Sequence, residues 1–450
     1  MLQAMLTARA TLIGIVLVTI AAGCRESAAD RLQRADALFQ QKLYDGAIAE
    51  YDRVAASEPN NPHAIRQLGL AHAAIGDRPR AIRYLERWRT MSALDSSARI
   101  ALGRLYLESG RPTEAAGEAS AVLAQWPDNM AALTLAGLAE LDAHNPTKAT
   151  EQFDRMARLA PSDAKALYLL GEGLLAEGRT RDAAQKFEAA LHLKPTYLDP
   201  LAKLVTIDLA AGRSIDALAR VNAQRALVGD SSRLVQLLAI VYLARDDRAN
   251  AESTLLRVMA LDPTYLDPIV RLSELYRSMG RNDQALQMVE QALALDPKNL
   301  SVRLVQGVTF EAKGDPVRAA RAYEIALAVN PKFAGAANNL ATLLAENVRE
   351  LGRALELATL AKTLEPDNPA IADTYGWVLF KRGEYAPSVA ALRGAAAALP
   401  SEPTIAYHLG MALAKYGDTT AARGSFRRSL AAPSPFPERE LARQALQLLR

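Results

Sequence analysis

The hexapeptide PTYLDP occurs twice in this chain of 450 residues, at residues 195–200 and at residues 263–268. The two copies start 68 residues apart, which is twice 34. A period of 34 residues is typical of stacked helical hairpins, because two helices of about 13 residues and two short turns fill that length. The duplication therefore predicts that residues with special backbone or packing roles recur every 34 positions.

Four kinds of residue recur in this register, and one inserted residue shifts the phase after Pro331. Proline occupies seven of the nine positions from Pro59 to Pro331. The alanine column is Ala47, Ala81, Ala115, Ala149, Ala183, Ala217, Ala251, Ala285 and Ala319, then Ala354, Ser388 and Ala422. The small-residue column is Ala35, Gly69, Gly103, Gly137, Gly171, Ala239, Ser273, Gly307, Ala341, Gly376 and Gly410, with Val205 as the exception. The turn-glycine column is Gly76, Gly110, Gly178, Gly212, Gly280, Gly314, Gly383 and Gly417.

Each column has a physical reason within a helical hairpin. The small residue on a first helix and the alanine on a second helix let the two helices cross closely. The turn glycine ends the first helix in the left-handed conformation. The proline closes the repeat, because it lacks a backbone donor and disfavours helix before it. In PTYLDP we expect Asp199 to be an N-cap and Pro200 the first helical residue, with Asp267 and Pro268 in the same roles.

The composition agrees with an all-α fold. Hydrophobic residues make up 50% of the chain but aromatic residues only 6%, and alanine and leucine, which favour helices, supply much of the apolar content. The formal charge is +3, from 53 basic and 50 acidic residues, so no general field attracts nucleic acid and we expect no nucleic-acid partner.

The repeated residues resemble those of the tetratricopeptide repeat, in about twelve repeats over residues 28–434. The resemblance implies a right-handed α-solenoid whose concave wall is lined by first helices and binds peptides or partner helices. The repeat from Leu198 to Ser231 departs most, because Val205 and Gly229 occupy two signature positions, and it could form a softer joint. Residues 435–450 predict a C-terminal capping helix that starts at Pro437.

The N-terminus resembles a bacterial lipoprotein signal. An apolar stretch from Thr11 to Ala22 leads through Gly23 to Cys24, the one cysteine of the chain. This stretch is shorter than the roughly 20 residues that cross a bilayer. The resemblance implies a signal peptide at residues 1–23, lipidation of Cys24 and a short tether at residues 24–27. An ordinary secretory leader or an N-terminal anchor helix are the alternatives. In that family Arg25 favours the outer membrane.

The residues give no indication of catalysis, and we expect neither a cofactor nor a metal. Five histidines are scattered, and the two that share a repeat, His63 and His72, lack the spacing of a metal site. The segment GEGLLAEGRT, which starts at Gly171, superficially looks like a phosphate-binding loop. Gly171 and Gly178 both fall in repeat columns, which favours a structural role. An enzyme of the glycosyltransferase type is disfavoured, because the repeats leave no room for a catalytic domain.

Two groups of side chains are candidate interaction surfaces. Trp377, Phe380, Tyr407 and Met411 lie on the first helices of the last two repeats, where rigid aromatic side chains could anchor a partner. Packing beneath the terminal helix is the alternative. Asn338 begins an earlier repeat and could hold a peptide backbone.

The second group is basic and lies near the predicted lipid anchor. Its members could meet anionic headgroups or acidic glycan, with a solvated helix face as the alternative. They are Arg78, Arg80, Arg83, Arg87 and Arg89.

Together these features predict a non-enzymatic scaffold, lipid-anchored in the bacterial cell envelope on the periplasmic face of the outer membrane. Residues 338–389 resemble tetratricopeptide lipoproteins of exopolysaccharide export and exosortase-type protein sorting. The alternative is an assembly factor for a secretin, a pilus or a barrel-insertion complex.

Overall fold

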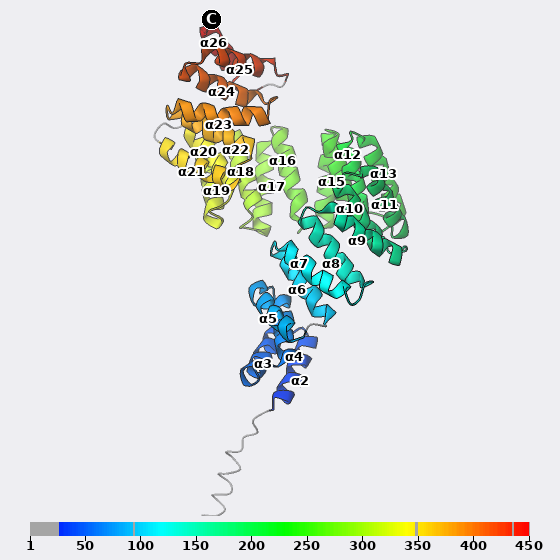
Figure 1. Cartoon of the computed structure of the whole chain (residues 1–450). Coiled ribbons are helices and arrows are strands. Elements are labelled where there is room, and N and C mark those ends of the chain that lie inside the picture. The colour runs from blue at the N-terminus through cyan, green and yellow to red at the C-terminus, as the bar shows by residue number, and fades with distance from the viewer. Residues whose placement is uncertain (1–26, 93–94, 347–349, 434–435, 450) are drawn as a thin grey trace, which may run out of the picture. The chain divides into compact units, whose positions relative to one another are not determined.

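A computed structural model describes residues 27–92, 95–346, 350–433 and 436–449. The described residues form 25 α-helices and no strand. The predicted signal peptide and Cys24 lie outside them. By their internal contacts the residues fall into two compact units, one ending at Gly229 and the other starting at Asp230. Within each compact unit, successive helices alternate as first and second members of antiparallel hairpins (Figure 1).

The helices confirm both the period and the inserted residue. First helices begin every 34 residues from Ala28 to Ala334, and the next begins 35 residues later at Pro369. The first helices are α2 (Ala28–Gln40), α4 (Pro62–Ala74), α6 (Ser96–Glu108), α8 (Met130–Asp142), α10 (Ala164–Ala176), α12 (Leu198–Ala210), α14 (Ser232–Ala244), α16 (Leu266–Ser278), α18 (Leu300–Ala312), α20 (Ala334–Ala345), α22 (Pro369–Lys381) and α24 (Pro403–Tyr416). The second helices are α3 (Tyr44–Ser57), α5 (Arg78–Met91), α7 (Pro112–Leu123), α9 (Pro146–Leu159), α11 (Thr180–Leu193), α13 (Ser214–Val228), α15 (Arg248–Leu261), α17 (Asn282–Leu295), α19 (Pro316–Val329), α21 (Leu351–Leu364), α23 (Tyr385–Ala398) and α25 (Thr419–Ala431).

In six of the seven hairpins with a glycine in the small-residue column, that glycine faces a large side chain of the second helix, whereas Gly103 faces Leu135 of the next first helix. A Cβ on Gly171 would lie only 2.5 Å from Cε1 of Phe187, whose side chain is fully buried. Gly410 faces Phe426 in the same way, at 2.6 Å. The alanine column is also buried, but the residue opposite the glycine is the one four positions after the alanine. Both columns therefore serve close packing, through a small-to-large contact that the sequence reading missed.

The turn glycines adopt the conformation that their column predicted. All eight have positive φ, between 68° and 100°. In three repeats without this glycine the equivalent positions are Lys42, His144 and Asp246, which keep a positive φ of 62°, 59° and 53°. The left-handed residue is thus a property of the turn, and side chains are forced into it where glycine is missing.

The expected roles of Asp199 and Asp267 as N-caps are wrong. Helix α12 begins at Leu198 and α16 at Leu266, after Tyr197 and Tyr265, which make no side-chain cap. The aspartates lie in the first turn, where a carboxylate still favours the helix dipole. Pro200 is tolerated at the third position, because the first four N–H groups of a helix have no partner inside it.

The repeat that departs most from the pattern ends at the boundary between the compact units. Val205, only 1% exposed, stands where other repeats have a small residue. Helices α12 and α13 pack less extensively than the other hairpins. Gly229 ends α13 with φ 78°, and the second compact unit starts at the next residue.

A terminal helix packs on the last hairpin, as expected. Helix α26 (Arg439–Leu448) contacts α25 and starts two residues after the expected Pro437. Ala442 is fully buried in a cluster with Phe426 and Phe436, whereas Leu448 is 87% exposed.

Candidate functional site

First helices form a continuous face within each compact unit. Helix α6 packs directly on α4 and α8, and α22 packs on α20 and α24. Among the described residues, no two consecutive second helices have comparable contact. The first helices therefore approach one another more closely, and the surface they form is called the first-helix face below.

Polar side chains on the first-helix face are largely paired with the next repeat. Arg66 Nε donates to Asp95 Oδ2 at 2.5 Å, and Lys203 Nζ donates to Glu172 Oε2 at 2.8 Å. In the second compact unit, Gln236 Nε2 donates to Asp267 Oδ2 at 2.5 Å. These bonds cross from one hairpin to its neighbour and fix their spacing.

Aromatic side chains replace this polar pairing near the end of the second compact unit. The indole of Trp377 stacks on Phe380 of the same helix, with ring centroids 4.8 Å apart. It also stacks on His408 of α24, at 4.0 Å, and the Lys381 ammonium lies 5.1 Å from its ring. His408 is fixed in turn by Asp373, whose Oδ1 is 2.9 Å from Nδ1. Trp377 is half-buried, so part of a rigidly held indole reaches the surface.

Tyr407 belongs to the core, which is the alternative that the sequence allowed. Its side chain is 4% exposed and packs in one cluster with Phe436 and Ala442 of the terminal segment. Burial raises the pKa of Tyr407, with Glu438 and Glu346 adding to the effect. A partner could not reach this ring without displacing α26. Phe380 and Met411 are half-buried against the same cluster.

Asn338 lies on α20, one repeat before Trp377 and two repeats before Tyr407. Its Nδ2 donates to Asn339 Oδ1 at 3.3 Å. Its own Oδ1 is buried and accepts no hydrogen bond from the described residues.

Three of the five N-terminal arginines lie near carboxylates, although four of the five are exposed. Arg78 Nε donates to Glu108 at 2.9 Å, and Arg89 donates to Glu118 at 2.5 Å. The hydrogen bond that Arg89 donates to Glu118 raises the pKa of Arg89. Arg80 lies 3.4 Å from Asp77.

The other two arginines of the group also have contacts. Arg87 Nη2 donates to the backbone carbonyl of Pro59 at 2.6 Å, and Arg83 lies 5.5 Å from the Tyr84 ring. Two of the five positive charges, those of Arg78 and Arg89, are therefore paired with carboxylates of neighbouring helices.

Catalytic chemistry receives no support from the geometry. His63 Nε2 lies 2.8 Å from Asp36 Oδ1, which also accepts from the Tyr51 hydroxyl at 2.5 Å, so the three side chains form a closed polar cluster. Within the described ranges no group of three or more His, Cys, Asp or Glu could hold a metal ion. Gly171 and Gly178 have the packing and turn roles given above, and neither lies in a phosphate-binding loop.

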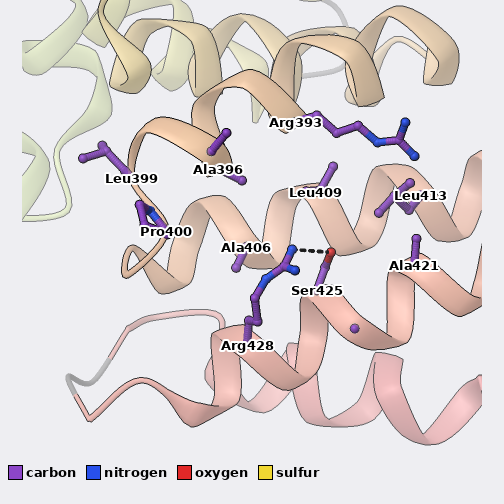
Figure 2. Close-up of a pocket in the computed structure, with 12 residues that line it drawn as sticks. Arg393, Ala396, Leu399, Pro400, Ala406, Leu409, Leu413, Ala421, Ser425 and Arg428 are labelled. Carbon is purple, nitrogen blue, oxygen red and sulfur yellow. Dashed lines mark hydrogen bonds between the residues drawn. The ribbon is translucent and has the colours of Figure 1, made fainter.

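A groove that sequence reasoning missed lies between α23 and α25 (Figure 2). It is a cavity of about 470 Å³, with Ala406, Leu409 and Leu413 of α24 among its lining residues. Small side chains on the two second helices leave it open, and Arg393 and Arg428 stand on opposite walls. Because three helices create it, no local motif marks it.

The fold defines an all-α solenoid of helical hairpins. Tetratricopeptide repeat models match residues 20–63, 66–130, 100–164, 134–197, 304–369 and 376–436, and a second such model matches 174–241 and 242–306. The chain belongs to the tetratricopeptide repeat family. Solenoids of this family typically bind protein partners along their extended surfaces and are a scaffold type of fold.

One similar sequence is the TPR repeat-containing protein PA4667 of Pseudomonas aeruginosa, which is 31% identical over 136 residues. That match covers 30% of this chain and 23% of the relative, so the chain spans about a quarter of its length. Yeast Tom70 has a similar structure, with a TM-score of 0.50 and 16% identity over 89% of this chain and 96% of that one.

A tetratricopeptide repeat protein of Parabacteroides merdae matches with a TM-score of 0.46 and 15% identity, over 56% of this chain and 97% of its own. At these identities the structural likeness shows the fold alone. In the described part of the chain, no helix has both the length and the apolar character needed to span a bilayer.

Proposed function

We propose that the protein is a lipid-anchored scaffold of the bacterial cell envelope, and that its first-helix face binds a partner protein near Trp377. The observation that carries the binding proposal is the half-buried indole, held by stacking on Phe380 and His408. A side chain that is already fixed loses little conformational entropy when a partner covers it. Asn338, with its unpaired amide oxygen, could bind the backbone of an extended segment on the same face.

Substitutions on this face test the binding proposal. Trp377→Ala should strongly reduce capture of protein partners from solubilised envelope and destabilise the fold less than Tyr407→Ala does, because part of the indole is exposed. Tyr407→Ala should instead lower the stability by about 3–5 kcal/mol, as removal of a buried aromatic side chain does. Equal capture by wild-type protein and the Trp377→Ala variant would contradict this proposal.

The membrane part of the proposal rests on the sequence from Thr11 to Cys24. A diacylglycerol on Cys24 would hold the repeats at the membrane surface through the tether at residues 24–27. Mass spectrometry of the mature protein should find a lipid-modified N-terminal cysteine, and Cys24→Ala should move the protein out of the membrane fraction. A mature N-terminus at any residue other than Cys24, or a Cys24 without lipid, would contradict the proposed anchor.

For the biological setting we favour exopolysaccharide export or the associated protein sorting, on the resemblance of residues 338–389. The second candidate, an assembly factor for a secretin, pilus or barrel-insertion machine, follows from the same anchored architecture. Capture of polysaccharide synthase or export components would support the first setting, whereas secretin or barrel components would support the second. Turnover of a sugar nucleotide by the purified protein would overturn both.

A further inference from the structure

At three seams between consecutive second helices, an acidic side chain at one repeated position of the earlier helix contacts the later helix. Glu188 Oε1 is 3.1 Å from Arg220 Nη1 of the next second helix, and Glu324 Oε1 is 2.8 Å from Arg353 Nη2. Asp52, at the same position of the first repeat, accepts from the Tyr84 hydroxyl at 3.4 Å. In each case a carboxylate from one repeat meets a donor from the following one.

The seam between α23 and α25 lacks this carboxylate. In the repeat register Arg393 stands where Glu188 and Glu324 stand in earlier repeats. The positions of the two partner arginines are taken by Ser425 and Ala421. An arginine has therefore replaced the acid, and short side chains have replaced the donors that would cover the groove.

The groove combines an apolar floor with two arginines that have no carboxylate of the described residues within hydrogen-bond distance. Leu409 and Leu413 line it from α24, and its cavity of about 470 Å³ is within the range of ligand sites. Arg393 is 59% exposed and 3.7 Å from Asp418, beyond hydrogen-bond distance. Arg428 Nη2 donates to the neutral Ser425 hydroxyl at 3.2 Å (Figure 2).

The surroundings add to the positive charge. From Tyr385 to Ala431 the sequence has five basic residues and two acidic ones, which gives 5 − 2 = +3. Whatever covers the groove should therefore bring carboxylates as well as apolar side chains, because guanidinium groups bind carboxylates with charge-assisted hydrogen bonds.

We propose that this groove binds an acidic amphipathic segment of a partner protein. Aliphatic side chains of the segment fill the floor over Leu409 and Leu413, and its carboxylates pair with Arg393 and Arg428. The partner thereby supplies the acid that Asp52, Glu188 and Glu324 supply within the chain at their own seams. The groove lies on the second helices, so the proposal stands independently of binding at Trp377.

The probe is a synthetic helical peptide of roughly 16 residues, about 24 Å long, with a leucine and alanine stripe flanked by glutamates. A matched peptide carries lysine at each glutamate position. Fluorescence anisotropy with the full-length protein measures binding of both. The acidic peptide should bind at least roughly tenfold more tightly than the basic one, since like charges oppose association.

Three variants locate the binding on the protein. Arg393→Glu combined with Arg428→Glu should weaken the acidic peptide at least roughly tenfold and favour the basic one. Ala397→Trp, at an exposed lining position, should block both peptides without changing the charge. Arg427→Glu is the matched control, because Arg427 is exposed on the same helix but does not line the groove.

Several outcomes would overturn the proposal. These are no binding of the acidic peptide, binding that Ala397→Trp leaves intact, and equal weakening by Arg427→Glu, which would indicate unspecific attraction. Binding of the wild-type protein to vesicles of anionic phospholipid that is lost in the double variant, with no peptide binding, would assign the arginines to a membrane surface instead. Circular dichroism of each variant shows whether the helices are retained.

Discussion

Replacing Gly171 with alanine would place a methyl group against the ring of Phe187. The added Cβ would lie 2.5 Å from Cε1, 2.7 Å from Cδ1 and 3.0 Å from Cζ. Phe187 is fully buried, so its ring has no solvent to move into. Overpacking costs about 1–3 kcal/mol, and a contact of 2.5 Å with a fully buried ring belongs to the upper part of that range, about 2–3 kcal/mol. Alanine recovers roughly 1 kcal/mol in helix propensity, which leaves a net loss of about 1–2 kcal/mol.

Gly117→Ala is the matched control, because Gly117 also lies inside a helix of the first compact unit. Nothing lies within 4 Å of the Cβ that it would gain. At this position only the higher helix propensity of alanine affects the stability. The variant should therefore be more stable than wild type by about 0.5–1 kcal/mol. The two glycine-to-alanine substitutions should therefore change the stability in opposite directions. The difference is that a new Cβ meets the Phe187 ring at Gly171 and meets nothing at Gly117.

Native-state hydrogen exchange of the amides in α10 and α11 measures the effect locally. A loss of about 1–2 kcal/mol should speed exchange roughly 5- to 30-fold in Gly171→Ala. Adding Phe187→Leu should make room for the methyl group, so the double variant should lose less than the sum of the two single variants. If Gly171→Ala slows exchange as Gly117→Ala does, contact with a large side chain is not the reason why the small-residue column needs a small residue.

Three other perturbations test separate parts of the account. His144→Gly should stabilise the hairpin of α8 and α9 by about 1 kcal/mol in chemical denaturation, because the residue has φ 59°; an unchanged or lower stability would contradict the turn argument. The hydrogen bonds from Arg281 hold the pKa of Glu252 below its ordinary 4.5, so the stabilisation is present above that value and is lost as the pH falls through the lower folded pKa. Exchange in α15 and α17 should accelerate there, and Glu252→Gln should flatten this acid dependence; an equally steep response in the variant would be inconsistent with it. Ending the chain after Pro433 should expose Tyr407 and Phe426, lower the melting temperature and promote association in light scattering, whereas a monomer of unchanged stability would show that α26 is dispensable.

The sequence predicted the features that depend on the backbone freedom or the size of a single residue. Gly178 marks a turn because of its φ, and Ala183 marks a close crossing because of its size, so a period of 34 residues is visible before any contact is known. The same turn at His144 was missed, since a side chain there carries no glycine signal. The start of α12 was misplaced because Asp199 and Pro200 are compatible with several positions in the first turn.

The candidate sites depend on contacts between different helices, and the recurring sequence positions carry no information about those contacts. Tyr407 was an open choice between surface and core until α26 was placed over it. Arg78 and Arg89 have their carboxylates about 30 residues away, on neighbouring helices, so a local count of arginines overstates the charge. The groove beside Arg393 exists only because two second helices and one first helix meet with short side chains.

Removing one whole repeat tests the central claim most directly, which is that the 34-residue phase alone dictates how the hairpins stack. Deletion of Met130–Asp163 joins Asn129 to Ala164 and restores an N-cap before a first helix. Circular dichroism during thermal unfolding should show unchanged helicity per residue and a cooperative transition. A deletion of Met130–Asp142 with its following turn, which leaves two second helices in succession, should lose helicity and aggregate. Equal behaviour of the two deletions, whether both fold or both fail, would contradict the claim.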